Sequence, residues 1–329
     1  MRMTTMLTTN ELSKSFSLKS SGLTRVMGKL GLTKPPAQRV YAVNEVSLSI
    51  ERGEVLGLVG ESGCGKSTVG RMIAGLLPAT SGSLSFEGED MTKPSLQTHL
   101  NIQMVFQNPY ASLNPRQRID QVISEAAVYH GLVERKNASA FVADLLKQVG
   151  LDPSYAGRYP HQFSGGQRQR IAIARALALD PKFIVCDEAV SALDVSVQAQ
   201  ILNLFMELRE TKQLTYLFIS HNLAVVEYIA DRVAIMYLGR IVEIADKRSV
   251  FARPNHPYTQ ALMADAPRLD AKVVDHRPIQ GELPSPLNPP AGCTFHPRCP
   301  RAMLRCSQER PMLRSIGDGH WSACHLNGA

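Results

Sequence analysis

The sequence predicts an α/β fold in which a mainly parallel β-sheet carries helices on both faces. Short apolar segments rich in Val, Ile and Leu alternate along the chain with segments of helical apolar spacing. In addition, the apolar segment at 54–60 is followed at once by a glycine-rich turn and a helical pattern. This alternation favours parallel strands joined by helical crossovers.

Length and composition narrow the class of protein. The chain has 329 residues, of which 44% are hydrophobic and 20% charged, which is typical of a soluble globular protein of about two domains. No apolar run approaches the roughly 18 residues of a membrane-spanning helix. The segment from Met1 to Asn10 lacks the apolar core of a secretory signal. We therefore expect a cytoplasmic protein that meets a membrane only through a partner or a surface patch.

The chain is basic, with 36 Lys and Arg against 29 Asp and Glu and a formal net charge of +7. This positive net charge is compatible with nucleic acid or an anionic membrane surface as a partner, and it does not distinguish between the two. Two strands, expected at 11–16 and 41–50, flank an insertion that predicts a loop. Residues 1–40 contain seven basic side chains and one acidic one, which indicates either a solvated arm or a contact to anionic lipid or a partner.

The remaining elements follow in order. A helix is expected at 66–77, ended by Pro78. Strands are expected at 83–87, 102–106, 183–186, 215–220 and 232–238, and helices at 121–131, 138–150, 166–179, 195–210 and 223–230. The first two of these later helices predict an inserted helical subdomain. Beyond residue 250, frequent prolines and weak periodicity predict a separate, irregular appendage.

A phosphate-binding motif stands between the first clear strand and its helix. The segment Gly60-Glu61-Ser62-Gly63-Cys64-Gly65-Lys66-Ser67-Thr68 matches G-x-x-x-x-G-K-[ST]. In this context the N–H groups of the loop and of the helix N-terminus can surround phosphate oxygens. Lys66 supplies a positive charge toward the β- and γ-phosphates, and Ser67 can bind Mg²⁺.

Two adjacent carboxylates, Asp187 and Glu188, end the apolar strand that begins at Phe183. Because the carboxyl ends of parallel strands face one crevice, we expect this pair to lie beside the phosphate loop. Asp187 can then hold the magnesium ion while Glu188 polarises an attacking water. The sequence therefore predicts hydrolysis of a bound nucleotide.

A second helix N-terminus that can bind an anion is predicted at Ser164-Gly165-Gly166-Gln167, which follows Phe163. One nucleotide does not need two such helix ends from the same subunit. This segment belongs to a set of motifs that resembles, in order and spacing, the nucleotide-binding subunit of ABC transporters over roughly residues 10–250. The set also contains the phosphate loop 60–68 (Walker A), Gln107, the carboxylates Asp187 and Glu188 (Walker B), Ser191-Ala192-Leu193-Asp194 and His221.

The resemblance implies a domain organisation. Residues 1–250 would form the ABC nucleotide-binding domain, a P-loop NTPase with a RecA-like core at about 1–100 and 168–250. An N-terminal antiparallel β subdomain and an inserted helical signature subdomain, at about 101–167, would complete it. Residues 251–329 would form an irregular, cysteine-bearing extension.

The resemblance also assigns roles within one subunit. Phe16 looks like the aromatic residue that stacks on adenine, with Tyr41 as the alternative. Gln107 looks like a contact to magnesium and the attacking water that also senses the transmembrane partner. His221 would contact the γ-phosphate. ATP and Mg²⁺ are the implied ligands.

Other implied roles act across a head-to-tail dimer. Ser164 and Gly166, within the signature Ser164-Gly165-Gly166-Gln167, would contact the γ-phosphate held by the opposite subunit. Asp194 would lie at the dimer interface. The implied partners are a second ABC ATPase subunit, expected to be a paralogue, and two transmembrane permeases on whose cytoplasmic face the chain would sit.

The C-terminal part narrows the transport class. With no fused transmembrane part, one signature and no long coiled-coil insertion, the chain is identified as an importer ATPase. The segments His256-Pro257-Tyr258, Gly281-Glu282-Leu283-Pro284 and Gln107-Asn108-Pro109-Tyr110 resemble dipeptide and oligopeptide importer ATPases, most of all the F-type subunit of dipeptide importers. This implies a peptide-binding protein as a further partner and no nucleic acid. A nickel or other small-solute importer, and a soluble nucleic-acid-dependent ATPase, are the alternatives.

Four cysteines, Cys293, Cys299, Cys306 and Cys324, are separated by five, six and seventeen residues. In a reducing compartment they are not expected to persist as disulfides. Their spacing fits structural zinc poorly, whereas a four-thiolate iron–sulfur cluster has looser spacing demands. The family resemblance implies a [4Fe–4S] cluster, with zinc and free thiols as the alternatives.

Overall fold

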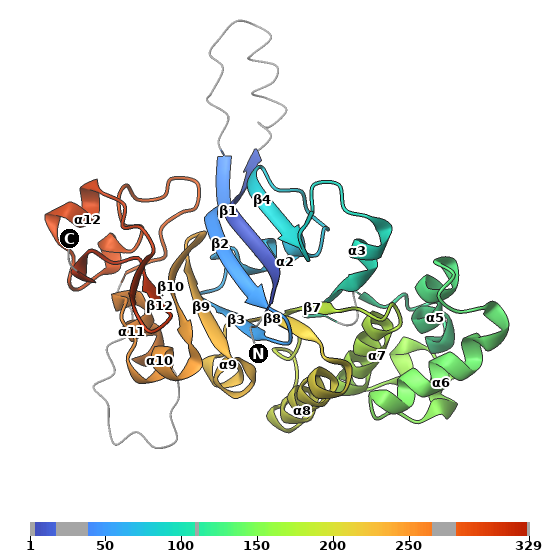
Figure 1. Ribbon diagram of the computed structural model, residues 1–329. Coiled ribbons are helices and arrows are strands. Elements are labelled where there is room, and N and C mark those ends of the chain that lie inside the picture. The colour runs from blue at the N-terminus through green and yellow to red at the C-terminus, as the bar shows by residue number, and fades with distance from the viewer. Residues whose placement is uncertain (1–3, 18–38, 109–111, 265–280, 328–329) are drawn as a thin grey trace, which may run out of the picture.

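The computed structural model describes residues 4–17, 39–108, 112–264 and 281–327. Two β-sheets form its centre, with a group of helices at one end and the C-terminal extension at the other (Figure 1). The loop and basic arm expected between the first two strands lie at 18–38, outside the described residues. Within the described residues, no helix combines the length and the apolar character needed to cross a bilayer.

The smaller sheet is antiparallel, as expected for an N-terminal β subdomain. Its strand order is β2-β1-β4-β5, with β1 at Thr5–Ser17, β2 at Arg39–Glu51, β4 at Ser81–Phe86 and β5 at Glu89–Asp90. Burial alternates along β2, because one face packs on the core and the other faces solvent. The first two strands are longer than the apolar pattern indicated, since their ends pair through polar residues.

The larger sheet contains the parallel strands that the sequence predicted. They are β3 (Val55–Val59), β6 (Ile102–Val105), β7 (Phe183–Asp187), β8 (Thr215–Ser220) and β9 (Arg232–Tyr237). Their order is β9-β3-β8-β7-β6, and every neighbouring pair is parallel. Helices cover one face, and α2 together with the smaller sheet covers the other, so β3, β7 and β8 are buried along their whole length.

Three antiparallel strands extend this sheet at one edge, and the sequence analysis did not predict them. They are β10 (Arg240–Asp246), β11 (Arg314–Gly317) and β12 (His320–Ser322), in the order β11-β12-β10 beside β9. A tight turn through Leu238 and Gly239, both with positive φ, joins β9 to β10. The C-terminal extension is therefore less irregular than its prolines indicated, since two of its strands belong to the central sheet.

The six predicted helices are present with different ends, and four short α-helices of the described residues were not predicted. The α-helices are α2 (Lys66–Ile73), α3 (Leu96–Asn101), α5 (Ile119–Tyr129), α6 (Ala138–Gln148), α7 (Gly165–Leu177), α8 (Val195–Lys212), α9 (Leu223–Ile229), α10 (Lys247–Ala252), α11 (Pro257–Ala264) and α12 (Leu304–Gln308). Short 3₁₀ turns lie at Arg135–Asn137, Pro153–Gly157, Pro160–Gln162, His296–Arg298 and His325–Asn327. Helix α2 ends before the predicted Leu77, because Gly75 adopts a positive φ of 70°.

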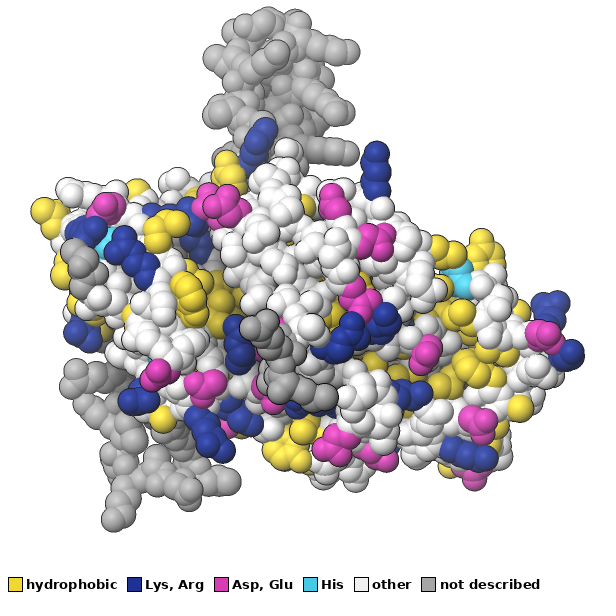
Figure 2. Space-filling view, viewed as in Figure 1, with side chains coloured by type: hydrophobic (Ala, Val, Ile, Leu, Met, Phe, Trp, Pro, Cys, Tyr) yellow, Lys and Arg dark blue, Asp and Glu magenta, His cyan; other side chains and the backbone are white. Residues whose placement is uncertain are grey.

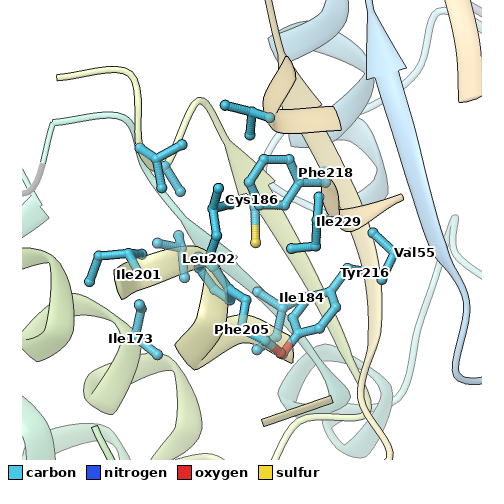
Figure 3. Packing of buried hydrophobic residues seen from close by; sticks show 14 of the residues in the cluster. Val55, Ile173, Ile184, Cys186, Ile201, Leu202, Phe205, Tyr216, Phe218 and Ile229 are labelled. Carbon is cyan, nitrogen blue, oxygen red and sulfur yellow. The ribbon is translucent and has the colours of Figure 1, made fainter. Parts of the chain in front are cut away.

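A large apolar cluster joins the parallel strands to the helices on one face of the sheet (Figure 3). The ring of Phe205 on α8 packs at 5.6 Å from that of Tyr216 and at 5.9 Å from that of Phe218, both on β8. The Tyr216 hydroxyl donates to the Phe205 carbonyl, so this buried polar group is satisfied. The same cluster includes α5, α6 and α7, so the helical group is packed onto the sheet that carries the site.

Candidate functional site

The parallel strands bring three predicted segments to one edge of the sheet. Val59, at the end of β3, pairs with Ser220 at the end of β8. Asp187, at the end of β7, pairs with Ile219 of β8. The phosphate loop, the two carboxylates and His221 therefore all begin at the carboxyl ends of adjacent strands, where α/β sheets form their ligand crevices.

The phosphate loop folds as its glycines require. A Cβ atom at Gly60 would lie 2.1 Å from the Met236 carbonyl oxygen. One at Gly65, whose φ is +110°, would lie 2.1 Å from the carbonyl oxygen of Ala42. Only glycine fits either position, because the loop backbone lies so close to these neighbouring segments.

Lys66 begins helix α2, with Ser67 and Thr68 in its first turn and Ser62 and Gly63 in the preceding loop. Its side chain is buried, and the ammonium donates to the carbonyl oxygens of Gly60 at 2.8 Å and of Glu61 at 3.0 Å. The positive charge is thus held inside the loop, where a phosphate would enter.

A hydroxyl and a carboxylate meet beside this lysine. Ser67 Oγ donates to Asp187 Oδ1 at 2.6 Å. Burial raises the pKa of Asp187, and the hydrogen bond from Ser67 opposes that shift only in part. A divalent cation would stabilise the ionised carboxylate, and both groups are oxygen ligands of the kind Mg²⁺ prefers, so the pair fits a magnesium ion.

Two of the predicted catalytic residues, Gln107 and His221, both contact the third, Glu188. Gln107 Nε2 donates to Glu188 Oε2 at 2.8 Å and to Ser191 Oγ at 3.2 Å, and His221 Nδ1 lies 3.3 Å from Glu188 Oε1. Glu188 has a φ of +49° and its N–H donates to the Ile219 carbonyl at 3.0 Å. The carboxylate is therefore held in one place beside Asp187. Ser191 was overlooked as a contact of Gln107, although it begins a motif that the sequence analysis singled out.

The signature segment lies at the start of α7. Ser164 is the N-cap: its Oγ accepts from the Gln167 N–H at 3.3 Å, and Gln167 Oε1 accepts from the Ser164 N–H at 3.0 Å. A Cβ atom at Gly166 would lie 2.4 Å from Val197 of α8, whose N-cap is Asp194. Within the described ranges, no hydrogen bond joins residues 164–167 to the phosphate loop of the same chain.

Phe16 and Tyr41, the two candidates for stacking on the adenine ring, are exposed on neighbouring strands. Phe16 is 40% and Tyr41 43% exposed, and Phe16 pairs in register with Val40, next to Tyr41. The Lys14 ammonium lies 5.4 Å from the centre of the Phe16 ring. The backbone after Tyr41 packs against Gly65, so these aromatic residues lie on the strands that border the loop.

The sequence analysis missed two residues that contact the phosphate loop from the C-terminal extension. Arg298 pairs with the Glu61 carboxylate, and the Tyr258 hydroxyl accepts a hydrogen bond from the Glu61 N–H. Both lie about 200 residues or more after Glu61. No local sequence signal predicts such contacts.

The four clustered cysteines are free of disulfides and all line one small cavity. The N–H of Cys293 donates to the Cys306 carbonyl at 2.8 Å, which brings two of the four segments together. Burial raises the pKa of Cys293 to about 11 and also raises those of Cys299 and Cys324. In the part of the chain that the structure describes, however, no three His, Cys, Asp or Glu side chains stand in an arrangement that could hold a metal ion.

Two family models and several named proteins are similar to this chain. Residues 43–191 match the family model for ABC transporters, and residues 242–306 match that for the oligopeptide/dipeptide transporter C-terminal region. The oligopeptide transport ATP-binding protein AppF of Bacillus subtilis strain 168 is 48% identical, over 98% of this chain and 97% of its own length. The dipeptide transport ATP-binding protein DppF of Escherichia coli K12 is 49% identical, over 88% of each.

A solved structure shows the same fold. CbiO1 of Clostridium perfringens, part of the ABC transporter complex CbiONQ, superposes with a TM-score of 0.62 and 25% identity, covering 76% of this chain and 91% of CbiO1. The phosphate loop, the Ser67–Asp187 pair and the buried parallel strands define a P-loop ATPase. The chain belongs to the ABC transporter family, as one of its ATP-hydrolysing, ATP-binding subunits.

Proposed function

We propose that this chain drives the import of dipeptides or oligopeptides. The observation that carries the proposal is the match of residues 242–306 to the oligopeptide/dipeptide transporter C-terminal region, outside the part shared by all ABC ATPases. The names of the two bacterial relatives, aligned over most of their lengths, support the same substrate class.

We assign the site residues roles in one catalytic cycle. The loop Gly60–Thr68 would hold the triphosphate of ATP, while Ser67, Asp187 and Gln107 would hold Mg²⁺. The bound cation would neutralise charge on the phosphates. Glu188, fixed by Gln107 and His221, would orient and deprotonate the attacking water.

The adenine ring would stack on Phe16, and His221 would contact the γ-phosphate. The exposure of Phe16, at 40%, leaves its ring free to stack. His221 is close enough to Glu188, at 3.3 Å, to link the carboxylate to the phosphate.

We propose that a complete site needs two subunits. Ser164, Gly165, Gly166, Gln167 and Asp194 would complete the site of the opposite subunit, since the signature makes no hydrogen bond to its own loop within the described residues. The second subunit would be a paralogue, and both would sit on the cytoplasmic face of two transmembrane permeases fed by a peptide-binding protein.

We propose that the chain consists of a RecA-like core, a helical subdomain and a C-terminal extension. The RecA-like core would comprise about 1–105 and 168–250, the helical subdomain about 106–167, and the extension 251–329. Because β6 at 102–105 pairs with β7 in the core sheet, we place the start of the helical subdomain after this strand.

The proposed transport function predicts a loss of peptide uptake without this chain. A strain lacking the gene should take up radiolabelled dipeptide only when complemented with the wild-type chain, and not with Lys66→Ala, which removes the charge inside the phosphate loop. Lys212→Ala, on an exposed residue of α8, is the matched control and should restore uptake. Mass spectrometry of co-purifying proteins should identify two permeases and a second ATPase.

Equal dipeptide uptake with and without the chain would contradict the proposal. Dependence of ⁶³Ni²⁺ uptake on the gene would instead favour the nickel alternative. Salt-sensitive stimulation of the ATPase by duplex DNA would favour a nucleic-acid-dependent enzyme. On the face shown in Figure 2, the basic side chains of the described residues are interspersed with acidic ones, which gives that alternative little support.

We further propose that Cys293, Cys299, Cys306 and Cys324 bind a [4Fe–4S] cluster. Four thiols, one buried and three partly buried, line one cavity without a disulfide. This arrangement supports a thiolate-bound group, because a cation would offset the raised pKa of Cys293. A bound cluster would also crosslink the extension.

This predicts that anaerobically purified protein is brown and contains about four iron and four sulfide per chain. Cys306→Ser should lose most of the iron and lower the melting temperature of the extension, while Cys186→Ala, a cysteine of the main core, should keep the iron. Elemental analysis that finds zinc, or no metal, would overturn the cluster.

A further inference from the structure

A bidentate ion pair joins the C-terminal extension to the phosphate loop. The Arg298 guanidinium donates to both carboxylate oxygens of Glu61, at 2.8 and 3.1 Å. The Arg298 side chain is only 7% exposed and that of Glu61 24%. Two parallel charge-assisted hydrogen bonds fix both the distance and the orientation of their partners, so this contact holds the loop more firmly than a surface pair would.

A second contact from the extension holds the backbone of the same residue. The Glu61 N–H donates to the Tyr258 hydroxyl at 2.9 Å. Tyr258 is fully buried, with its ring 4.6 Å from that of Tyr237 and 5.4 Å from that of Phe295. Because this aromatic cluster locks the ring, the hydroxyl is a fixed acceptor and not a mobile one.

Glu61 also contacts Lys66, the lysine of the phosphate loop. The Glu61 carbonyl accepts from the Lys66 ammonium at 3.0 Å, while its N–H is held by Tyr258 and its carboxylate by Arg298. A triphosphate in the loop would compete with these carbonyls for the Lys66 ammonium. The loop then keeps its shape through the contacts that the extension provides.

The pair also controls the charge next to the phosphates. Glu61 lies between Gly60 and Ser62, so an unpaired carboxylate there would repel the anionic triphosphate. Arg298 neutralises it, and because the Arg298 side chain is only 7% exposed, water screens this pair less than it screens a surface pair.

We propose that Arg298 and Tyr258 are positioning residues for ATP binding, through which the C-terminal extension sets the affinity of the phosphate loop in its own chain. Arg298 acts by neutralising and orienting Glu61, and Tyr258 acts by fixing the Glu61 main chain. The extension is then part of the nucleotide site and not only a module attached to the ATPase domain.

A double-mutant cycle on the full chain tests this. Arg298→Gln should raise the Kd of a fluorescent ATP analogue, and the KM for ATP, by roughly tenfold, because Glu61 is left unpaired. Since Glu188, Gln107 and His221 are untouched, kcat of the assembled transporter should change by less than about threefold. The double variant Glu61→Gln with Arg298→Gln should return to within about threefold of the wild-type Kd, because the repelling charge is then gone.

Two further variants separate charge from folding. Arg305→Gln removes a similar arginine that pairs with Glu309 within the extension, and it should leave ATP affinity unchanged. Tyr258→Phe keeps the ring packing but removes the acceptor for the Glu61 N–H, and it should raise Kd about threefold with an unchanged kcat.

Unchanged ATP affinity in both Arg298→Gln and Tyr258→Phe would overturn the proposal. So would a double variant that binds ATP as weakly as Arg298→Gln alone, because a merely structural role of Arg298 predicts no rescue by Glu61→Gln. Melting temperatures of all variants identify any general loss of folding.

Discussion

Glu188→Gln is expected to bind ATP like the wild-type chain and to slow hydrolysis in the assembled transporter by roughly 10²- to 10⁴-fold. The glutamine amide is nearly isosteric and can still accept from Gln107, which lies 2.8 Å from the carboxylate, but it cannot take a proton from water. Ser67 and Asp187, which fit the magnesium ion, are untouched. Steady-state phosphate release and equilibrium binding of a fluorescent ATP analogue measure the two effects separately.

A matched control for this change is Glu227→Gln on helix α9, an exposed carboxylate away from the carboxyl edge of the sheet. It should leave both turnover and affinity unchanged. Turnover by Glu188→Gln within about threefold of wild type would show that another group activates the water. Loss of ATP binding would show that Glu188 shapes the nucleotide pocket and does not act as a base.

Ser164→Arg is expected to abolish transport and ATP-driven dimer closure, while the isolated chain keeps its ATP affinity. The side chain at this position starts α7 and makes no hydrogen bond to the phosphate loop of its own chain within the described residues. A bulky cation there would block the surface that we assign to the opposite subunit. Peptide uptake, ATP-dependent dimerisation in light scattering, and ATP binding by the single chain are the three measurements.

The substitution also removes a helix cap, which costs about 1 kcal/mol by itself. Ser95→Arg supplies the control, because Ser95 is the N-cap of α3 and accepts from the Thr98 N–H. It should lower stability by a similar amount and leave transport intact. If Ser164→Arg eliminated ATP binding by the isolated chain, the arrangement of the signature across two subunits would be wrong.

Much of the site could be predicted because its signals are local. The phosphate loop is a contiguous segment whose glycines are required by close backbone contacts, as the 2.1 Å approaches at Gly60 and Gly65 show. Asp187 and Glu188 could be placed beside it because the carboxyl ends of parallel strands share one edge. The hydrogen bond from Gln107 to Glu188 and the close contact of His221 with Glu188 agree with that placement.

Prediction of the fold was weaker where pairing partners are distant or segments are short. Strand β12 has three residues, and it exists because its backbone groups pair with β10 and β11. Helix α3 has six residues and a single buried face, too few for a clear helical period. Proline-rich composition predicted an irregular extension, and tertiary pairing nevertheless drew two of its strands into the central sheet.

By itself, the sequence determined the class of enzyme, since a nine-residue loop and a pair of adjacent carboxylates specify phosphate and magnesium chemistry through local geometry. Only the tertiary structure decided that the extension reaches this site. Arg298 meets Glu61 across 237 residues, and Tyr258 meets it across 197. Such contacts depend on how α11 and the extension pack beside β9 and β10 (Figure 1), and hydrophobic spacing along the chain carries no information about that packing.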